Sequence, residues 1–128
     1  MAFETQTEGP RDLAFLLSQA PRTRSLDTIT VASGEGKLEP GTILGEVTAT
    51  EKYVASPNAE VVGKEGAETA TAILAYGVDA TSTDVEAVVV SDDAEVKEPM
   101  LVVHASVDDA TKRAAKVAQL RAVGIKAR

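Results

Sequence analysis

Residues 23–54 read TRSLDTITVASGEGKLEPGTILGEVTATEKYV, and they carry the clearest fold signal in the chain. Their β-branched side chains predict a strand over residues 27–33 and a second over residues 42–50, because such side chains suit a pleated sheet. Glycine and proline between these strands predict a turn, since glycine readily adopts positive φ. Gly45 inside the second strand indicates a bulge or the close approach of another backbone. Residues 52–54 are expected to form a short third strand.

Further strands are expected downstream. Residues 69–78 predict a buried strand with Ile73, Leu74 and Tyr76 as its bulk, and the run VEAVVV at residues 85–90 predicts another. Residues 55–68, rich in glycine and charge, predict a loop. The remaining expectations are a polar turn at residues 79–84, a short edge strand at residues 95–97 and a strand at residues 100–104.

One helix is expected near the end of the chain, over residues 108–123. Asp108 and Asp109 suit its start, where carboxylates accept hydrogen bonds from free N–H groups. Gly124 suits a left-handed C-cap, with Ile125 opening a last short strand. The spacing places Ala110, Ala114, Val117 and Leu120 or Arg121 on the inner face. The basic residues Lys112, Arg113, Lys116 and Arg121 are expected on the outer face.

The composition predicts one small soluble domain. The chain has 128 residues, of which 44% are hydrophobic but only 3% aromatic. Such a core buries little area per side chain, so association with a partner would add stability. A net charge of -7 disfavours nucleic acid as a partner. No apolar run approaches the ~20 residues of a membrane span, and the polar start does not resemble a signal peptide, so we expect a protein made in the cytoplasm.

Residues 1–22 differ in character from the rest. Phe3, Thr5 and Thr7 alternate with charged or amide side chains, a two-residue period typical of a strand, and Gly9-Pro10 breaks it. Asp12 could cap a short apolar segment over residues 13–17, which is too brief to form a core alone. An unordered tail is one interpretation. We favour an extended arm that adds a strand to a sheet edge on a partner, since a tail would not need these apolar residues.

The stretch at residues 23–54, together with TATAILAYGVDATSTDVEAVVV (69–90) and LVVHASVDDATKRAAKVAQLRAVGI (101–125), resembles the lambda D-like head decoration proteins of tailed bacteriophages. The resemblance implies a β-rich α+β fold: a small mixed-β domain at residues 23–128 with one C-terminal helix, preceded by a flexible, extended N-terminal arm at residues 1–22. It also implies a structural protein without enzymatic activity.

The resemblance further implies how such a protein acts. Family members bind the outer surface of the expanded phage head as homotrimers and stabilise the shell of the virion against the pressure of packed DNA. Their N-terminal segment engages the major capsid protein. The arm residues expected to make this contact here are Phe3, Glu4, Thr5, Gln6, Thr7, Glu8 and Pro10. Trimer contacts are expected near Ile43, Leu44 and Ala49.

Residues that suggest chemistry have simpler structural interpretations. His104 is the only histidine, and catalysis would need a nucleophile or carboxylate fixed beside it, so we expect a structural role at a strand end. One histidine without any cysteine argues against a zinc site. The acidic pairs at residues 92–93 and 108–109 predict a turn and a helix cap. The glycine pairs at 34–36 and 63–66 lack a following phosphate-binding helix. We therefore expect no catalytic residue, cofactor or metal.

Two alternatives stay open. Residues 40–54 look like half of a lipoyl or biotin carrier domain, in which a hairpin exposes a modified lysine, here Lys52. Tyr53 and Val54 follow it, where the lipoyl pattern has Lys-Ala and the biotin pattern Met-Lys-Met. The chain could also be another phage structural protein, such as a tail or connector component.

Overall fold

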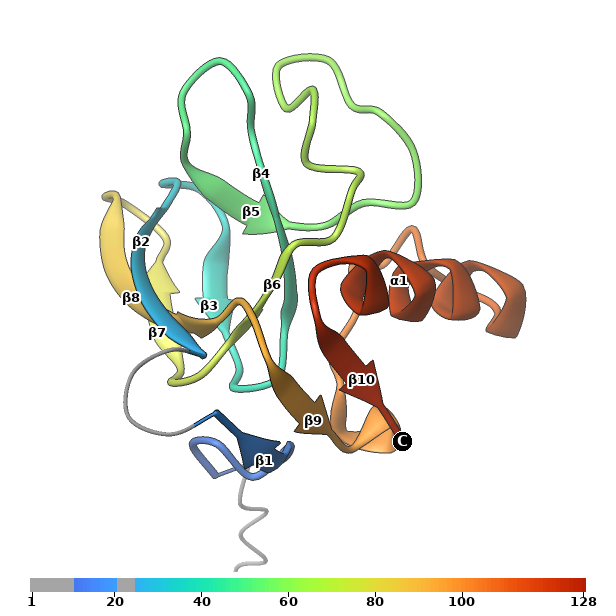
Figure 1. Cartoon of the computed structure of the whole chain (residues 1–128). Helices are drawn as coiled ribbons and strands as arrows, with labels where there is room; N and C mark the ends of the chain where they lie inside the picture. The colour runs from blue at the N-terminus through green and yellow to red at the C-terminus, as the bar shows by residue number, and fades with distance from the viewer. Residues whose placement is uncertain (1–10, 21–24) are drawn as a thin grey trace, which may run out of the picture.

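The computed structural model describes residues 11–20 and 25–128. Its centre is a closed five-stranded barrel (Figure 1). In barrel order the strands are β2 (Leu26–Val31), β5 (Tyr53–Ala55), β4 (Ile43–Glu46), β6 (Ala72–Leu74) and β8 (Val85–Val90).

Two smaller sheets and two helical segments complete the described chain. Strands β3 (Gly36–Leu38) and β7 (Val78–Ala80) form an antiparallel pair. The second sheet has the order β1 (Leu16–Gln19), β9 (Ala94–Val96), β10 (Ile125–Ala127). The 3-10 helix η1 (Glu98–Met100) follows β9, and the α-helix α1 (Ala110–Ala122) precedes β10.

The barrel strands bury side chains on both of their faces, because successive residues of a strand point to opposite sides. Leu44, Leu74 and Val89 belong to one cluster with Val31 and Ala72. Their sequence neighbours Ile43, Ile73 and Val90 belong to a second cluster. Continuous apolar runs such as AIL and VVV therefore reflect strands that are covered on both sides.

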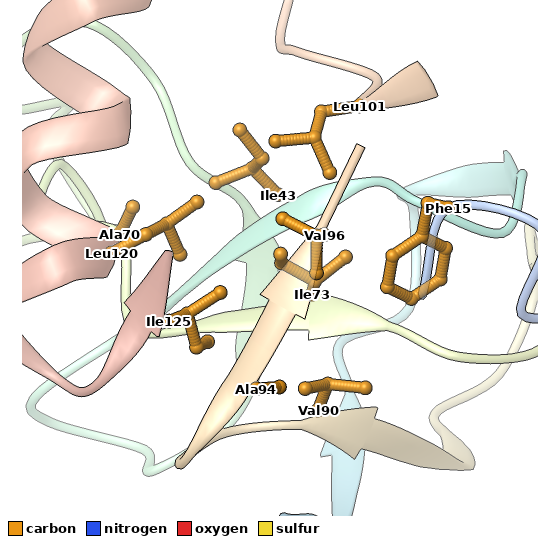
Figure 2. Packing of buried hydrophobic residues seen from close by; sticks show 10 residues of the cluster. All are labelled: Phe15, Ile43, Ala70, Ile73, Val90, Ala94, Val96, Leu101, Leu120 and Ile125. Carbon is orange, nitrogen blue, oxygen red and sulfur yellow. The ribbon is translucent and has the colours of Figure 1, made fainter. Parts of the chain in front are cut away.

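The second cluster joins the barrel to the β1–β9–β10 sheet and to helix α1. Figure 2 shows the ring of Phe15 and the side chains of Val96, Leu120 and Ile125 around the barrel residues of this cluster. These four residues are all buried. The three-stranded sheet and the helix are thus parts of the same folded unit as the barrel.

Gly45 permits the close backbone approach that its place in the sequence predicts. A Cβ built on Gly45 would lie 2.0 Å from the carbonyl oxygen of Ala67. No side chain fits there, so only glycine lets the end of the 56–68 loop pack on β4.

Several predicted elements are confirmed. The strands expected at residues 27–33 and 85–90 correspond to β2 and β8. The Asp109 side chain caps α1 by accepting from the backbone N–H of Lys112, and Gly124 has a φ of +92°. Ile125 opens β10 as expected. The fold is therefore β-rich with one C-terminal helix.

Other predicted elements are wrong. The expected strand at residues 100–104 makes only an isolated bridge, between Thr42 and Val102, because η1 occupies the preceding residues. The strand over 42–50 ends at Glu46, since the chain turns at residues 48–50. The expected edge strand at 95–97 is β9, the centre of its sheet. Tyr76 lies beyond β6 and is exposed rather than buried.

The predicted faces of the helix are wrong in part: Leu120 is buried as expected, but two of the alanines and Lys116 lie on the opposite faces from those predicted. Ala110 and Ala114 are exposed, whereas Lys116 and Leu120 are the buried residues of α1. Lys116 can lie inside because backbone oxygen atoms of the 56–68 loop surround its ammonium group. Arg113 likewise points inward, to Glu98 and to the carbonyl oxygen of Leu101.

Candidate functional site

The predicted arm residues Phe3, Glu4, Thr5, Gln6, Thr7, Glu8 and Pro10 lie outside the described residues. The structure instead shows where that segment joins the domain. Residues 11–20 lead into β1, which lies at one edge of the β1–β9–β10 sheet (Figure 1). The boundary expected at residue 22 also falls outside the described residues, within 21–24.

The residues at this junction are firmly held by the domain. The Phe15 side chain is 1% exposed, and its carbonyl accepts from Lys97 N–H at 2.6 Å. The Leu13 N–H donates to the carbonyl of Ala75 at 3.0 Å. The Asp12 carboxylate accepts from Gly77 N–H at 3.2 Å, so it does not cap a helix. The apolar segment at residues 13–17 therefore anchors the chain to the core.

The edge strand β1 includes an exposed apolar residue. Leu17 is 46% exposed and lies at an irregular position, where the register with β9 shifts between Leu16 and Ser18. On its other side β1 pairs antiparallel with β9. Any strand that continued the sheet would have to add at β1 or at β10, its two edges.

His104 lies in a hydrogen-bonded turn with Ser106. Its Nδ1 atom is 2.8 Å from Ser106 Oγ and accepts from Ser106 N–H at 3.1 Å. Ser106 Oγ also accepts from the Asn58 N–H at 2.8 Å. Because the Nδ1 lone pair is occupied by the turn, the ring ties residues 104–106 together and is poorly placed to act as a base. Ser106 is the partner that sequence reasoning missed.

The acidic pairs serve local structure, as their positions predict. Asp92 accepts from the N–H of Asp93 at 2.8 Å in the turn before β9. Asp109 caps α1, and Asp108 lies 2.7 Å from the Lys112 ammonium. Within residues 11–20 and 25–128, no group of three or more His, Cys, Asp or Glu residues could hold a metal ion.

A surface groove of about 560 Å³ lies beside His104. Glu35 and the more exposed Glu39 are the acidic residues in its lining, and Glu35 is the less exposed of the two. Its Oε1 accepts from Ala55 N–H at 2.8 Å, and its Oε2 pairs with Lys64 at 3.1 Å. Both oxygens are engaged in holding the fold, so the groove offers no free carboxylate at Glu35. The neighbouring glycines Gly34 and Gly36 have positive φ, as turn residues do.

Lys52, the candidate for a modified lysine, lies just before β5. Its ammonium is 2.6 Å from Asp84 Oδ2 in a half-exposed ion pair. The pair joins the β4–β5 hairpin to the turn before β8. Ile43 and Leu44, expected near trimer contacts, are buried in the two cores, and only Ala49 of that group is exposed.

Comparison with known proteins settles which class the chain falls in. It matches the family described as "Bacteriophage lambda head decoration protein D" over residues 5–125. The chain belongs to this head decoration family. No curated protein matches it. The match covers nearly the whole chain, including the barrel, the β3–β7 pair, the helix, and strands β1 and β9, and it ends at the first residue of β10.

Membership confirms the resemblance that the sequence indicated. A head decoration protein is a structural component of the viral capsid, and the β-rich fold with its C-terminal helix agrees with the expectation. The match favours head decoration over a carrier domain modified at Lys52 and over a tail or connector component. Within the described residues, no helix is long and apolar enough to cross a membrane.

The matched range bears on the arm as well. It begins at residue 5, so it includes Thr5, Gln6, Thr7, Glu8 and Pro10 but not Phe3 and Glu4.

Two residues that matter for the domain were missed by sequence reasoning. Phe15 lies in a short apolar segment whose packing partner the sequence does not reveal. Lys116 lies among basic residues whose pattern indicates a solvent-exposed helix face.

Proposed function

We propose that this head decoration protein binds the outer surface of the expanded phage head as a homotrimer and stabilises the shell against the pressure of packed DNA. Its partner is the major capsid protein, which the arm contacts through the residues that precede the docked segment at 11–20. The family match over residues 5–125 carries this proposal, because it identifies the protein as a decoration protein and includes most of the arm.

The anchored junction supports a binding role for the arm. Because Phe15 is fixed in the core, residues before Arg11 are connected to the domain by a short, docked segment. A short connection keeps a binding segment at high local concentration once the domain is close to the shell. Three such segments in a trimer would act together, so each could bind weakly and still retain the protein.

Strand addition is the mode of contact we propose. The alternating pattern of Phe3, Thr5 and Thr7 suits an extended strand whose main chain pairs with a sheet edge of the capsid protein. Phe3 is the anchor among these, since a buried aromatic side chain contributes most to such interfaces.

The test is co-sedimentation with expanded, undecorated capsids of the same phage. Wild-type protein should bind saturably, at about one copy per major capsid subunit if three copies occupy each trimer site. Absence of binding to shells that are shown to be competent would refute the decoration mechanism.

Deletion of residues 1–10 tests the arm. We expect loss of shell binding with the domain still folded, because the deletion leaves Phe15 and β1 intact. His104→Ala is the matched control, since it changes a turn that is not part of the arm and should bind as wild type. A folded deletion variant that binds normally would rule out the arm.

Phe3→Ala tests the anchor. If the ring enters a pocket of the shell, truncation should weaken binding by about 1–3 kcal/mol, a roughly 5- to 150-fold rise in Kd. Thr5→Ala is the control, because it truncates a smaller side chain in the same segment and should weaken binding less than Phe3→Ala. An unchanged Kd for Phe3→Ala would show that Phe3 is not the anchor. Strand addition through main-chain hydrogen bonds would then carry the binding.

A further inference from the structure

The ammonium of Lys116 is enclosed by oxygen atoms of the 56–68 loop. The side chain is 2% exposed, although lysine is among the residues least often buried. Its Nζ atom donates to Ser56 Oγ at 2.8 Å, to the Pro57 carbonyl at 2.6 Å and to the Glu68 carbonyl at 2.5 Å. Three donors thus meet three acceptors, which is what a buried ammonium requires.

These contacts close the loop at both of its ends. Ser56 and Pro57 open the loop, and Glu68 ends it, so one charged group of α1 holds both ends. The link continues through Ser56, whose Oγ donates to the carbonyl of Ala67 at 2.7 Å and whose N–H donates to Ile43 in β4. The loop is therefore fixed to the helix and the barrel through one network.

Between these ends the loop is weakly held and strongly exposed. Val62 is 95% exposed, more than any other large apolar side chain of the described residues. Beyond the network, the Asn58 N–H donates to Ser106, Lys64 pairs with Glu35, and Thr48 N–H donates to Glu65. At its end the loop also packs through Ala67, and hydrogen bonds within residues 61–68 shape its middle. The Lys116 network thus joins the two ends of a loop whose exposed middle makes few contacts with the rest of the domain.

We propose that Lys116 is a charge-dependent latch, whose protonated ammonium holds the 56–68 loop closed and whose loss of charge frees the loop while the barrel stays folded. A neutral amine has two N–H donors instead of three, so at least one of the three oxygen atoms would lose its partner. An unpaired buried carbonyl is costly, and the loop can relieve that cost by moving into water.

The surroundings favour loss of the proton at alkaline pH. Burial lowers the pKa of Lys116, and the negative charge of Glu68 opposes this only in part. Of the other cations of the helix, Lys112 pairs with Asp108, Arg113 pairs with Glu98, and Arg121 is exposed in the last turn. Gln119, also near Nζ at 3.4 Å, is uncharged.

The absence of cysteine allows a clean experiment on the whole chain. Val62→Cys introduces the only thiol, at an exposed position, and a spin label attached there reports the motion of the loop. Thr83→Cys, in the exposed turn before β8, provides a labelled site outside the latch. Folding of each variant is checked by circular dichroism and thermal unfolding.

Lys116→Met should free the loop. We expect the rotational correlation time of the label at position 62 to fall roughly twofold or more, with no change at position 83. Lys112→Met is the matched control, because it removes a half-exposed helix cation that makes no contact with the loop network, and it should leave both sites unchanged. A folded Lys116→Met variant with an unchanged label at position 62 would overturn the proposal.

The pH dependence with Lys116 intact decides the matter even if Lys116→Met does not fold; it is measured with Lys64→Met in place, so that loss of the Lys64–Glu35 pair cannot account for the change. As the pH rises from about 7 toward the ordinary lysine pKa of about 10.4, the label at position 62 should become mobile before the protein unfolds. The label at position 83 should keep its mobility over that range. If both labels change only with global unfolding, Lys116 is not a latch.

Discussion

Single residues in this protein connect parts of the chain that are distant in sequence. Phe15 is the largest apolar example, because its ring fills the space between the barrel and the β1–β9–β10 sheet (Figure 2). In a chain with only 3% aromatic residues, few other side chains could fill that volume. The stability of the junction therefore depends on this one ring.

Phe15→Ala should lower the free energy of unfolding by about 3–5 kcal/mol, because it removes buried surface and leaves a cavity. The neighbouring Leu17→Ala is the control: its side chain is exposed, so its effect should stay within about 0.5 kcal/mol. Urea unfolding of both variants provides the measurement. Equal effects of the two changes would show that the junction is not part of the core.

Asp84 illustrates a polar connection at the same scale. Its carboxylate pairs with Lys52 and accepts from the Ser33 N–H at 2.8 Å. These hydrogen bonds, that of Lys52 first, hold the pKa of Asp84 below its ordinary value. The folded state thus favours the charged carboxylate.

A carboxyl group with a lowered pKa stabilises the fold above its unfolded-state pKa, near pH 4, and this contribution is lost as the pH falls through the folded-state pKa. Asp84→Asn should therefore lose stability at pH 7 and show a smaller decline between about pH 5 and pH 2. Lys52→Met should also lower the stability at pH 7 and reduce the acid decline, but by less than Asp84→Asn. Thermal unfolding across this range is the measurement, and an acid decline as steep as that of wild type would contradict the assignment.

At the scale of elements, local patterns predicted what local forces determine. The run at residues 85–90 became β8, and Asp109 with Gly124 bounded α1, because strand propensity and helix capping act within a few residues. The pattern also predicted the close approach at Gly45, though not its partner. These features needed no knowledge of the rest of the chain.

Elements whose character depends on distant partners could not be predicted in this way. Strand β9 is central because β1 and β10 flank it, and both of these strands lie far from β9 in the sequence. The burial of Lys116 depends on oxygen atoms of residues 56, 57 and 68, which no helical periodicity can reveal. The arm residues were chosen from their pattern and the family resemblance, and they stay a prediction.

Gly45→Ala tests how tightly two elements pack. The added methyl group would overlap the Ala67 carbonyl, so β4 or the end of the loop must shift, at a cost of about 2–3 kcal/mol. Gly77→Ala is the control, because its Cβ would meet ordinary neighbours at 3.4 Å and its φ is not positive. Urea unfolding that showed equal stability for both variants would contradict the close approach.

At the scale of the whole molecule, the residues before and after Arg11 should differ in their contribution to folding. Deletion of residues 1–10 should leave the thermal midpoint within a few degrees of wild type, since the core is untouched. Deletion of residues 1–19 removes Phe15 and β1, and should lower stability by at least about 3 kcal/mol. Comparable midpoints for the two deletions would show that β1 belongs to the arm.

The position of β9 between β1 and β10 has a consequence for synthesis on the ribosome. Strand β1 is among the first parts of the domain to be made, but the other neighbour of β9 exists only after residue 127 has been added. Until then Val96 and the barrel residues beneath it lack part of their cover. A nascent chain therefore stays accessible to chaperones and proteases until β10 has been made, and the domain gains its full protection in one late step.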